Sequence, residues 1–250
     1  MNLKKETVKK LILFLVIILV AEPLISAPIP GISFDISADD SPDGVAVSLK
    51  ILALLTVLTL IPSILIMMTS FTRLIIIFQF IKRALGMPQL PGQIFIGLSL
   101  FLTLFIMSPV LSDMNKNALQ PYLNKQITQK EALKNAEISI KNFMLRQTRD
   151  KDLQLFIKAS NMNKPETRND LPLTVVMPGF MINELRIAFQ IGFILYLPFL
   201  MIDIIVSSIL LSMGMLMLPP MMISLPLKIL LFVLADGWYL LVESAIAGFR

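Results

Sequence analysis

Four long stretches of the chain consist almost entirely of apolar residues. They cover residues 51–68, 94–112, 187–218 and 221–242. The first two contain no charged residue, and each stretch approaches or exceeds the ~20 apolar residues that an α-helix needs to cross a bilayer. The pattern predicts an all-α, membrane-type protein in which four spans form two long helical hairpins.

The first hairpin, residues 46–112, has a basic tip. Arg73, Lys82 and Arg83 lie between its two apolar stretches without any acidic residue, and the turn GMPQLPGQ follows at 86–93. Short basic loops stay in the cytoplasm under the positive-inside rule. The tip is therefore expected on the cytoplasmic side, which places the segment after the hairpin outside the cytoplasm.

Residues 113–184 predict a small soluble helical domain inserted between the two hairpins. Eleven Lys or Arg and seven Asp or Glu fall between Asp113 and Asp170. Stretches such as KEALKNAEISIKNFMLRQ show the helical spacing of apolar residues. The second hairpin, residues 185–250, returns to apolar character and contains the methionine-rich turn SMGMLMLPPMM.

The N-terminus has the pattern of a secretory signal peptide over residues 1–27. Lysines precede ten apolar residues at 11–20, which are too few for a membrane span, and small residues follow. An uncleaved N-terminal anchor is the alternative interpretation. Residues 28–45 are rich in Pro, Asp, Ser and Gly and predict an extended lead-in.

Composition narrows the chemistry that the chain can perform. Hydrophobic residues make up 56% of it, above the ~45–50% of soluble domains. Because the chain contains no cysteine and no histidine, disulfides, Cys- or His-based metal sites and Ser-His-Asp triads are excluded. The net charge of +5 is spread along the chain, so we expect no nucleic-acid binding. We also expect no metal, no cofactor and no enzymatic activity.

Five charged residues occur in or beside the last two apolar stretches. They are Glu184, Arg186, Asp203, Lys228 and Asp236. A lone charge at the centre of a bilayer costs ~2.5–3.5 kcal/mol, so these groups must pair within the chain, pair between subunits or meet water. We favour contacts between subunits or a cavity for Asp203, Lys228 and Asp236. For Glu184 and Arg186, a structural role near a helix start is equally reasonable.

Asp203 and Asp236 also raise the possibility of an intramembrane aspartyl protease. Such an enzyme needs two carboxylates that share a proton. The local sequences LMIDIIV and VLADGWY lack the Gly-x-Gly-Asp context typical of these proteases. We therefore rank this interpretation below a structural one.

The turn at residues 212–222 holds five methionines in eleven positions. Met213, Met215 and Met217 alternate with Gly214 and Leu216, and a Pro-Pro pair follows. Methionine side chains are unbranched and adapt to irregular partners, while the prolines end the preceding helix. The pattern suits the soft lining of a pore through which a polypeptide moves. A buried hairpin turn with methionine as gap filler is the alternative.

Several long stretches together resemble the FliP family, which supplies a membrane subunit of the flagellar type III protein-export gate. They are ILIMMTSFTRLIIIFQFIKRALG, GLSLFLTLFIMSPV, PGFMINELRIAFQIGFILYLPFLMIDIIVSSILLSMGM and LPLKILLFVLADGWYLL. In the family's order, they cover nearly all of residues 46–245. The leader also resembles that of flagellar members rather than that of their injectisome relatives.

The resemblance implies a function in protein translocation. Family members assemble in about five copies with FliR-type and FliQ-type subunits, dock with the FlhB and FlhA components, and conduct unfolded flagellar proteins. It also implies a place in the inner membrane at the flagellar basal body, with the soluble domain on the periplasmic side. Assembled subunits are held largely above the bilayer plane, so the apolar stretches need not all face lipid.

The resemblance also implies roles for individual residues. The family's channel gasket falls on Met213, Met215, Leu216 and Met217, where Leu216 replaces a methionine. Glu184 and Lys228 match positions of contact between neighbouring subunits, and Phe143 and Phe156 match aromatic interface positions. Core packing of the small helical domain is an equally good interpretation of these two phenylalanines. A small-solute transporter and a membrane enzyme are the competing classes of function.

Overall fold

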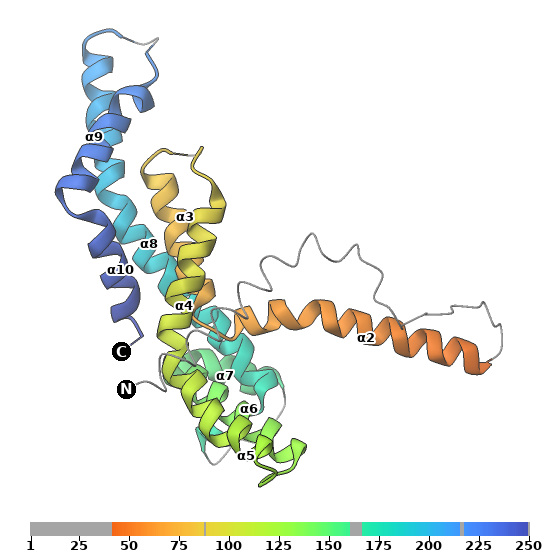
Figure 1. The fold of residues 1–250 in the computed structure, drawn as a ribbon. Coiled ribbons are helices and arrows are strands. Elements are labelled where there is room, and N and C mark those ends of the chain that lie inside the picture. Colours follow the sequence, from red (N-terminus) through yellow and green to blue (C-terminus); the bar gives the residue numbers. More distant parts are fainter. Residues whose placement is uncertain (1–41, 88, 161–166, 216–217, 250) are drawn as a thin grey trace. The chain divides into compact units, whose positions relative to one another are not determined.

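The computed structural model describes residues 42–87, 89–160, 167–215 and 218–249 (Figure 1). These residues are helical, with no strand among them, which confirms the predicted all-α class. The chain divides into two compact units, Met1–Thr56 and Val57–Arg250. The signal peptide and most of the lead-in predicted for residues 1–45 lie outside the described residues.

Helix α2, Pro42–Met67, begins in the first unit and ends in the second. It contains the first apolar stretch, and large side chains such as Leu52, Leu55 and Leu58 are exposed along it. The helix continues past Pro62 and stops just before Thr69, whose hydroxyl donates a hydrogen bond to the Ile66 carbonyl oxygen at 2.8 Å.

The next two helices, α3 (Phe71–Ala84) and α4 (Gly92–Met114), pack against each other across a short turn. Gly86 adopts a φ of +67° in this turn, a conformation that glycine accepts without steric cost. Helix α3 is amphipathic, and residues three or four apart form its buried face. These are Arg73, Leu74, Ile77, Phe78, Ile81 and Ala84. The predicted tight turn after the basic segment is therefore present.

The longest helix, α8 (Leu173–Ser212), has 40 residues and is the main partner of α3. At 1.5 Å per residue it extends ~60 Å. The two helices run in the same direction, since Arg73 meets Glu184, and Phe80 meets Gly192 about two turns further along both helices. A Cβ on Gly192 would lie 2.5 Å from the Phe80 ring, so the absence of a side chain permits this close approach.

A compact helical part follows α4 and packs against the start of α8. It comprises the π-helix Asn115–Leu119, α5 (Gln120–Leu123), α6 (Gln129–Gln147), α7 (Asp150–Ala159) and the 3-10 turn Arg168–Asp170. Thr128 and Glu131 form a capping box at the start of α6, and the backbone and hydroxyl donors of Thr128 lower the pKa of the Glu131 carboxyl. Because α8 begins at Leu173, the predicted soluble domain and second hairpin share one continuous helix across their boundary at residue 184.

The buried side chains form two clusters. The first, between α3, α4, α8 and the last helices, is centred on Leu74, Phe78 and Phe95. The second joins the compact helical part to α8 through Met144 and Phe180. The described apolar side chains of the compact part therefore share one core with the first turns of α8.

The chain ends in α9 (Pro220–Leu234) and α10 (Gly237–Ala247), which meet at a bend of 66°. Asp236 sits at the bend with a φ of +49°, a left-handed conformation that is uncommon for a residue other than glycine. Figure 1 shows α9 turning back along α8, with α10 continuing toward the C-terminus.

Two helical stretches, Gly92–Leu123 and Leu173–Ser212, are long and apolar enough to cross a membrane. The number rises to three if α9 and α10 count as one span. The prediction of four spans is therefore not met by the described residues. In the part of α2 that the structure describes, Leu49–Ile64 is a shorter apolar helix, and the bend at the left-handed residue Asp236 divides the fourth stretch.

The approach of α3 to α8 predicts opposite effects for two glycine substitutions. Gly192→Ala should lower the free energy of unfolding by about 1–3 kcal/mol because the new methyl group collides with Phe80. Gly97→Ala, within α4, is the matched control: no atom lies within 4 Å of its added Cβ, so the helix should gain up to about 1 kcal/mol. Denaturant unfolding in detergent, followed by circular dichroism, measures both. Equal effects would contradict the close approach.

Candidate functional site

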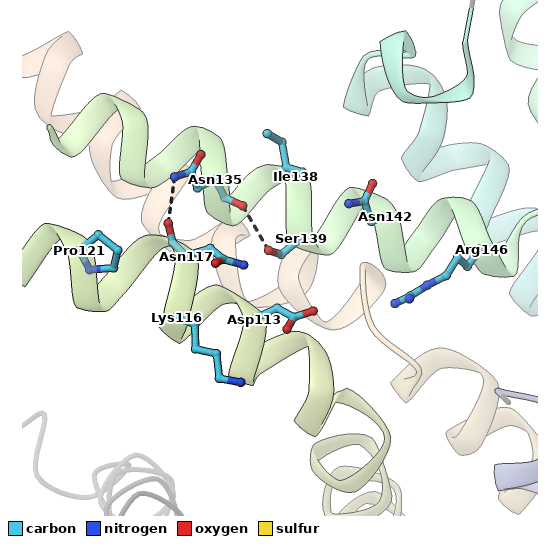
Figure 2. Close-up of a pocket in the computed structure, with 9 residues that line it drawn as sticks. All are labelled: Asp113, Lys116, Asn117, Pro121, Asn135, Ile138, Ser139, Asn142 and Arg146. Atoms are coloured by element: carbon cyan, nitrogen blue, oxygen red, sulfur yellow. Dashed lines mark hydrogen bonds between the residues drawn. The ribbon is translucent and has the colours of Figure 1, made fainter. Parts of the chain in front are cut away.

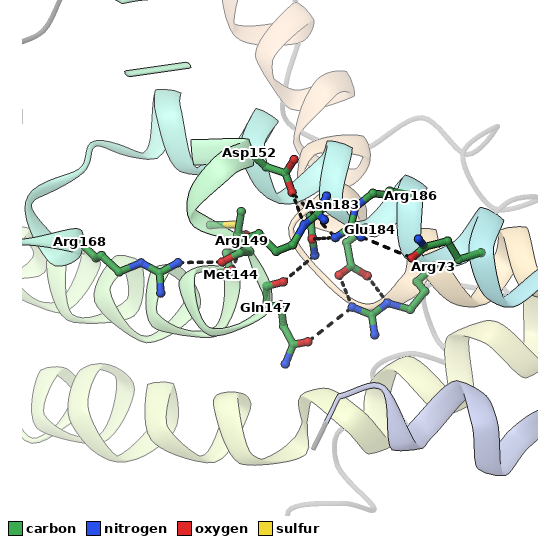
Figure 3. A network of polar contacts seen from close by, with 11 residues as sticks. Arg73, Met144, Gln147, Arg149, Asp152, Arg168, Asn183, Glu184 and Arg186 are labelled. Carbon is green, nitrogen blue, oxygen red and sulfur yellow. Dashed lines mark hydrogen bonds and ion pairs between the residues drawn. The ribbon is translucent and has the colours of Figure 1, made fainter. Parts of the chain in front are cut away.

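A buried ion pair joins α3 to α8. The Arg73 Nε donates a hydrogen bond to Glu184 Oε2 at 2.8 Å, and its Nη2 donates to Glu184 Oε1 (Figure 3). Both side chains are fully buried. The pairing is bidentate, the geometry in which a guanidinium binds a carboxylate most strongly.

Arg73 also connects two further parts of the chain. Its Nη1 donates to the Gly248 carbonyl oxygen at 2.8 Å, and its Nη2 reaches the Gln147 Oε1 at 3.5 Å. The guanidinium lies 3.6 Å from the centroid of the Phe249 ring, a cation–π contact. One side chain therefore holds α3, α8, the end of α6 and the C-terminal residues together.

Sequence reasoning assigned Arg73 to the exposed basic tip and missed this role. The signal was present in the helical spacing, because Arg73 lies four and eight positions before Ile77 and Ile81 of the buried face. A cation on the apolar stripe of an amphipathic helix requires a buried acid. Glu184 was identified as a candidate, and the structure supplies its partner within the chain.

Arg186, the second predicted residue at this place, is half-buried and lies in a looser network. Its Nη2 donates to Asn183 Oδ1 at 2.6 Å and lies 4.0 Å from Asp152 Oδ2. Asn183 in turn donates to the Gln147 carbonyl oxygen at 2.5 Å. Figure 3 shows this network beside the Arg73–Glu184 pair. Arg186 Nε is buried and has no hydrogen-bond partner among the described residues.

A second ion pair joins α8 to α9. The Lys228 Nζ donates to Asp203 Oδ2 at 2.5 Å, with side-chain exposures of 4% for the lysine and 28% for the aspartate. The other carboxylate oxygen, Asp203 Oδ1, is buried without a hydrogen-bond partner in the described part of the chain. The pair thus gives Lys228 a counter-charge, while Asp203 Oδ1 remains without a donor among the described residues.

Asp236 forms no ion pair with any of the residues that the structure describes. It is exposed at the junction of α9 and α10, and its carbonyl oxygen accepts the first hydrogen bond of α10 from Leu240 N at 3.2 Å. Asp203 is paired with Lys228 instead. Over the described ranges, no three His, Cys, Asp or Glu side chains gather in a way that could hold a metal.

The methionine turn begins with a well-defined helix end. Gly214 N donates to the Leu211 carbonyl oxygen at 3.1 Å, and Met215 N donates to the Leu210 carbonyl oxygen at 2.9 Å. With Gly214 at a φ of +73°, these two bonds form a Schellman motif, which satisfies carbonyl groups that the helix leaves free. The backbone of the turn is therefore held in place at its start.

The side chains of this turn are open to their surroundings. Met213 is 62% exposed and Met215 is 42% exposed, and Met221 and Met222 on the first turn of α9 are also exposed. The alternative of a buried hairpin turn does not apply to these residues within the chain. Two of the predicted gasket residues, Leu216 and Met217, lie outside the described residues.

The two phenylalanines predicted as interface positions pack inside the chain. Phe143 is buried, with its ring 5.8 Å from that of Phe180 in an edge-to-face contact and 6.4 Å from that of Phe249. Phe156 is half-buried and packs against the same cluster. Core packing accounts for these contacts, and a role between subunits stays a prediction.

A polar groove of about 430 Å³ lies between the π-helix and α6 (Figure 2). Its lining includes Asp113, Lys116, Asn142 and Arg146. Asn135 Nδ2 donates to the Asn117 carbonyl oxygen at 2.9 Å, which satisfies a backbone acceptor of the wide π-turn. The Ser139 hydroxyl donates to the Asn135 carbonyl oxygen at 3.2 Å, so its proton is directed to the backbone of the same helix.

The buried and exposed ion pairs predict different costs for the same chemical change. Glu184→Gln leaves the buried Arg73 without its counter-charge and should lower the free energy of unfolding by about 3–5 kcal/mol. Asp150→Asn is the control, because the Asp150–Arg168 pair is largely exposed and such pairs contribute about 0–1 kcal/mol. Denaturant unfolding in detergent compares the two. The double change Arg73→Met with Glu184→Leu should recover much of the loss, and losses of equal size in the two single variants would contradict the buried pairing.

Comparison with known proteins identifies the family. The FliP family profile matches residues 54–245. The flagellar biosynthetic protein FliP of Bacillus subtilis is 51% identical over 216 residues, which cover 86% of this chain and 98% of the relative. That of Aquifex aeolicus is 44% identical over 94% of this chain and 98% of the relative. That of Treponema pallidum is 45% identical over 88% of this chain and 83% of the relative. This chain therefore belongs to the FliP family of flagellar biosynthetic proteins.

Proposed function

We propose that this chain is a core subunit of the flagellar type III protein export gate. With its partners it forms the channel for unfolded flagellar proteins, and the methionine-rich loop seals that channel. The observation that carries the proposal is the presentation of exposed methionines on a fixed helix end at Met213–Met215. Membership of the family of flagellar biosynthetic proteins supports it.

The apolar surface of the second unit supports assembly with other subunits. Large side chains on α8 and α9, such as Phe193, Ile194, Leu211 and Leu230, are each more than half exposed. Soluble monomers rarely expose continuous apolar surface beyond a few hundred Å². We propose that about five copies cover part of this surface, together with FliR-type and FliQ-type subunits. The FlhB and FlhA components dock on the assembled gate.

The methionine turn suits a seal that opens for a polypeptide and closes again. The Schellman motif at Gly214 holds the backbone, while flexible thioether side chains project from it. A ring of such side chains from several copies excludes water and ions in the manner of a hydrophobic gate. A passing chain displaces the side chains without moving the helices behind them. Leu216 and Met217 complete the proposed ring.

The proposed location is the bacterial inner membrane at the flagellar basal body. The two long apolar helical stretches support a membrane protein. Lys82 and Arg83 in the last turn of α3 form the basic tip that the positive-inside rule keeps in the cytoplasm. On this orientation the compact helical part within residues 113–184 lies on the periplasmic side. The proposed activity is transport and not catalysis.

The seal is tested by removing the thioether side chains. Replacement of Met213, Met215 and Met217 together by alanine should raise ion leakage during export, because three smaller side chains per copy leave a wider opening. Met201→Ala is the control, since Met201 is exposed on the middle of α8 and outside the turn. Leakage is followed with an ion-sensitive dye in cells that assemble the gate. Unchanged leakage in the triple variant would argue against the seal.

The Lys228–Asp203 pair is tested through assembly. Lys228→Ala leaves Asp203 without its partner and should destabilise the subunit by up to about 3 kcal/mol, the lower end of the range for buried pairs because Asp203 is partly exposed. The yield of complex on native gels should fall before export by assembled gates is affected. The double variant Lys228→Met with Asp203→Leu separates two roles of the pair. If the yield of complex returns to normal, the pair acts within the chain. If the yield stays low, the charged groups contact a neighbouring subunit. Normal yield of Lys228→Ala would show that the pair is dispensable.

A further inference from the structure

A groove of about 210 Å³ lies on the face where α3 packs beside α8. Its lining residues are Ile75, Ile76, Gln79, Phe80 and Arg83 of α3, and Phe189 of α8. The α3 positions recur at intervals of three and four residues and so share one face of the helix. From residue 75 to residue 83 this face extends ~12 Å. The face is apolar at Ile75 and Ile76, carries an amide at Gln79, and ends with the guanidinium of Arg83.

The apolar part of the groove is built by ring packing. Phe80 and Phe189 meet edge to face with their centroids 5.3 Å apart, and Phe80 is seated against Gly192. Phe189 is 56% exposed and forms the open wall on α8. The wall residue Phe189 belongs to α8, which is long and apolar enough to cross a membrane.

The polar end of the groove carries a positive charge that the described residues do not neutralise. Arg83 is exposed, and no ion pair to it occurs within the described ranges. The sequence contains no acidic residue from position 44 to position 112. The charge of Arg73 on the same helix is neutralised by Glu184, so the two arginines of α3 differ in their need for an anion.

We propose that this groove binds an anionic phospholipid, with the phosphate on Arg83 and Gln79 and an acyl chain along Ile75, Ile76 and Phe189. The volume is below the ~300–1,000 Å³ of ordinary small-molecule pockets, and a water-soluble anion would find no partner at the apolar end. An anionic lipid matches both ends, and basic pockets between membrane helices bind such headgroups. The proposal does not depend on the channel or on the methionine seal.

A simpler role for the charge is to complement the last carbonyl groups of α3, since cations stabilise helix C-termini. Lys82 and Arg83 share that last turn, but only Arg83 lines the groove. Lys82→Gln is therefore the matched control for Arg83→Gln. Both variants remove one charge from the same turn, and only one removes the group that faces the groove.

Fluorescence quenching tests the site directly. Trp238 is the only tryptophan of the sequence, so Trp238→Phe with Phe189→Trp places a single indole on the groove wall. The full chain is reconstituted in phosphatidylcholine vesicles that contain increasing amounts of phosphatidylglycerol with brominated acyl chains. Quenching should reach half its maximum at a lower mole fraction than with brominated phosphatidylcholine. Arg83→Gln should raise that fraction about fivefold, the effect of one cation near an anionic lipid, and Lys82→Gln should change it less than twofold.

Three results would overturn the proposal. Equal quenching by the two lipids would show no headgroup recognition, and equal effects of the two charge variants would show attraction to the surface only. Absence of quenching by either lipid would show that a protein surface covers the groove. Circular dichroism checks that each variant is folded. If the Phe189→Trp variant does not fold, Ile75→Trp places the indole in the same groove and serves as the second reporter. The experiment measures lipid binding and does not measure export. Its result therefore tests the lipid site alone, whether or not the proposal of an export channel is correct.

Discussion

The structure depends on a guanidinium that has no contact with water. An unpartnered Arg73 at this depth would cost several kcal/mol, and the fold avoids that cost by bringing acceptors from α8, α6 and the C-terminal residues to it. These segments therefore cannot shift independently. The pair with Glu184 sets the level at which α3 meets α8, and the contact of Phe80 with Gly192 follows from that register.

The ion pairs within the chain change the argument for assembly. Glu184 and Lys228, which the resemblance assigned to contacts between subunits, each have a partner inside this chain. Among the described residues, the apolar surface of the long helices stays without a partner, as do a few buried polar atoms such as Arg186 Nε and Asp203 Oδ1. The case for neighbouring subunits therefore rests on apolar surface and family membership more than on charge.

Helix α9 lies between two left-handed residues with different consequences. Gly214 adopts its φ without steric cost and closes a Schellman motif, so the methionine turn starts from a relaxed backbone. Asp236 adopts a similar φ with a side chain, which costs of order 1–3 kcal/mol unless its surroundings hold it. The first arrangement presents flexible side chains on a fixed base, and the second redirects the chain by 66° within an apolar stretch.

Local pattern alone was enough to predict the helical class, the turn at Gly86 and the charged helical segment after residue 112, because periodicity and turn residues act over a few positions. It misplaced Arg73 and predicted an unbroken helix across Asp236. The partner of Arg73 lies 111 positions away, and no local pattern specifies which acid a buried cation will meet. The sequence offered five charges in or beside the last two apolar stretches, and Arg73 was not counted among them. The packing of α3 and α9 on α8 pairs Arg73 with Glu184 and Lys228 with Asp203. Only the tertiary structure decided these pairs, because a charge removed from water must meet an opposite charge that the fold brings to it.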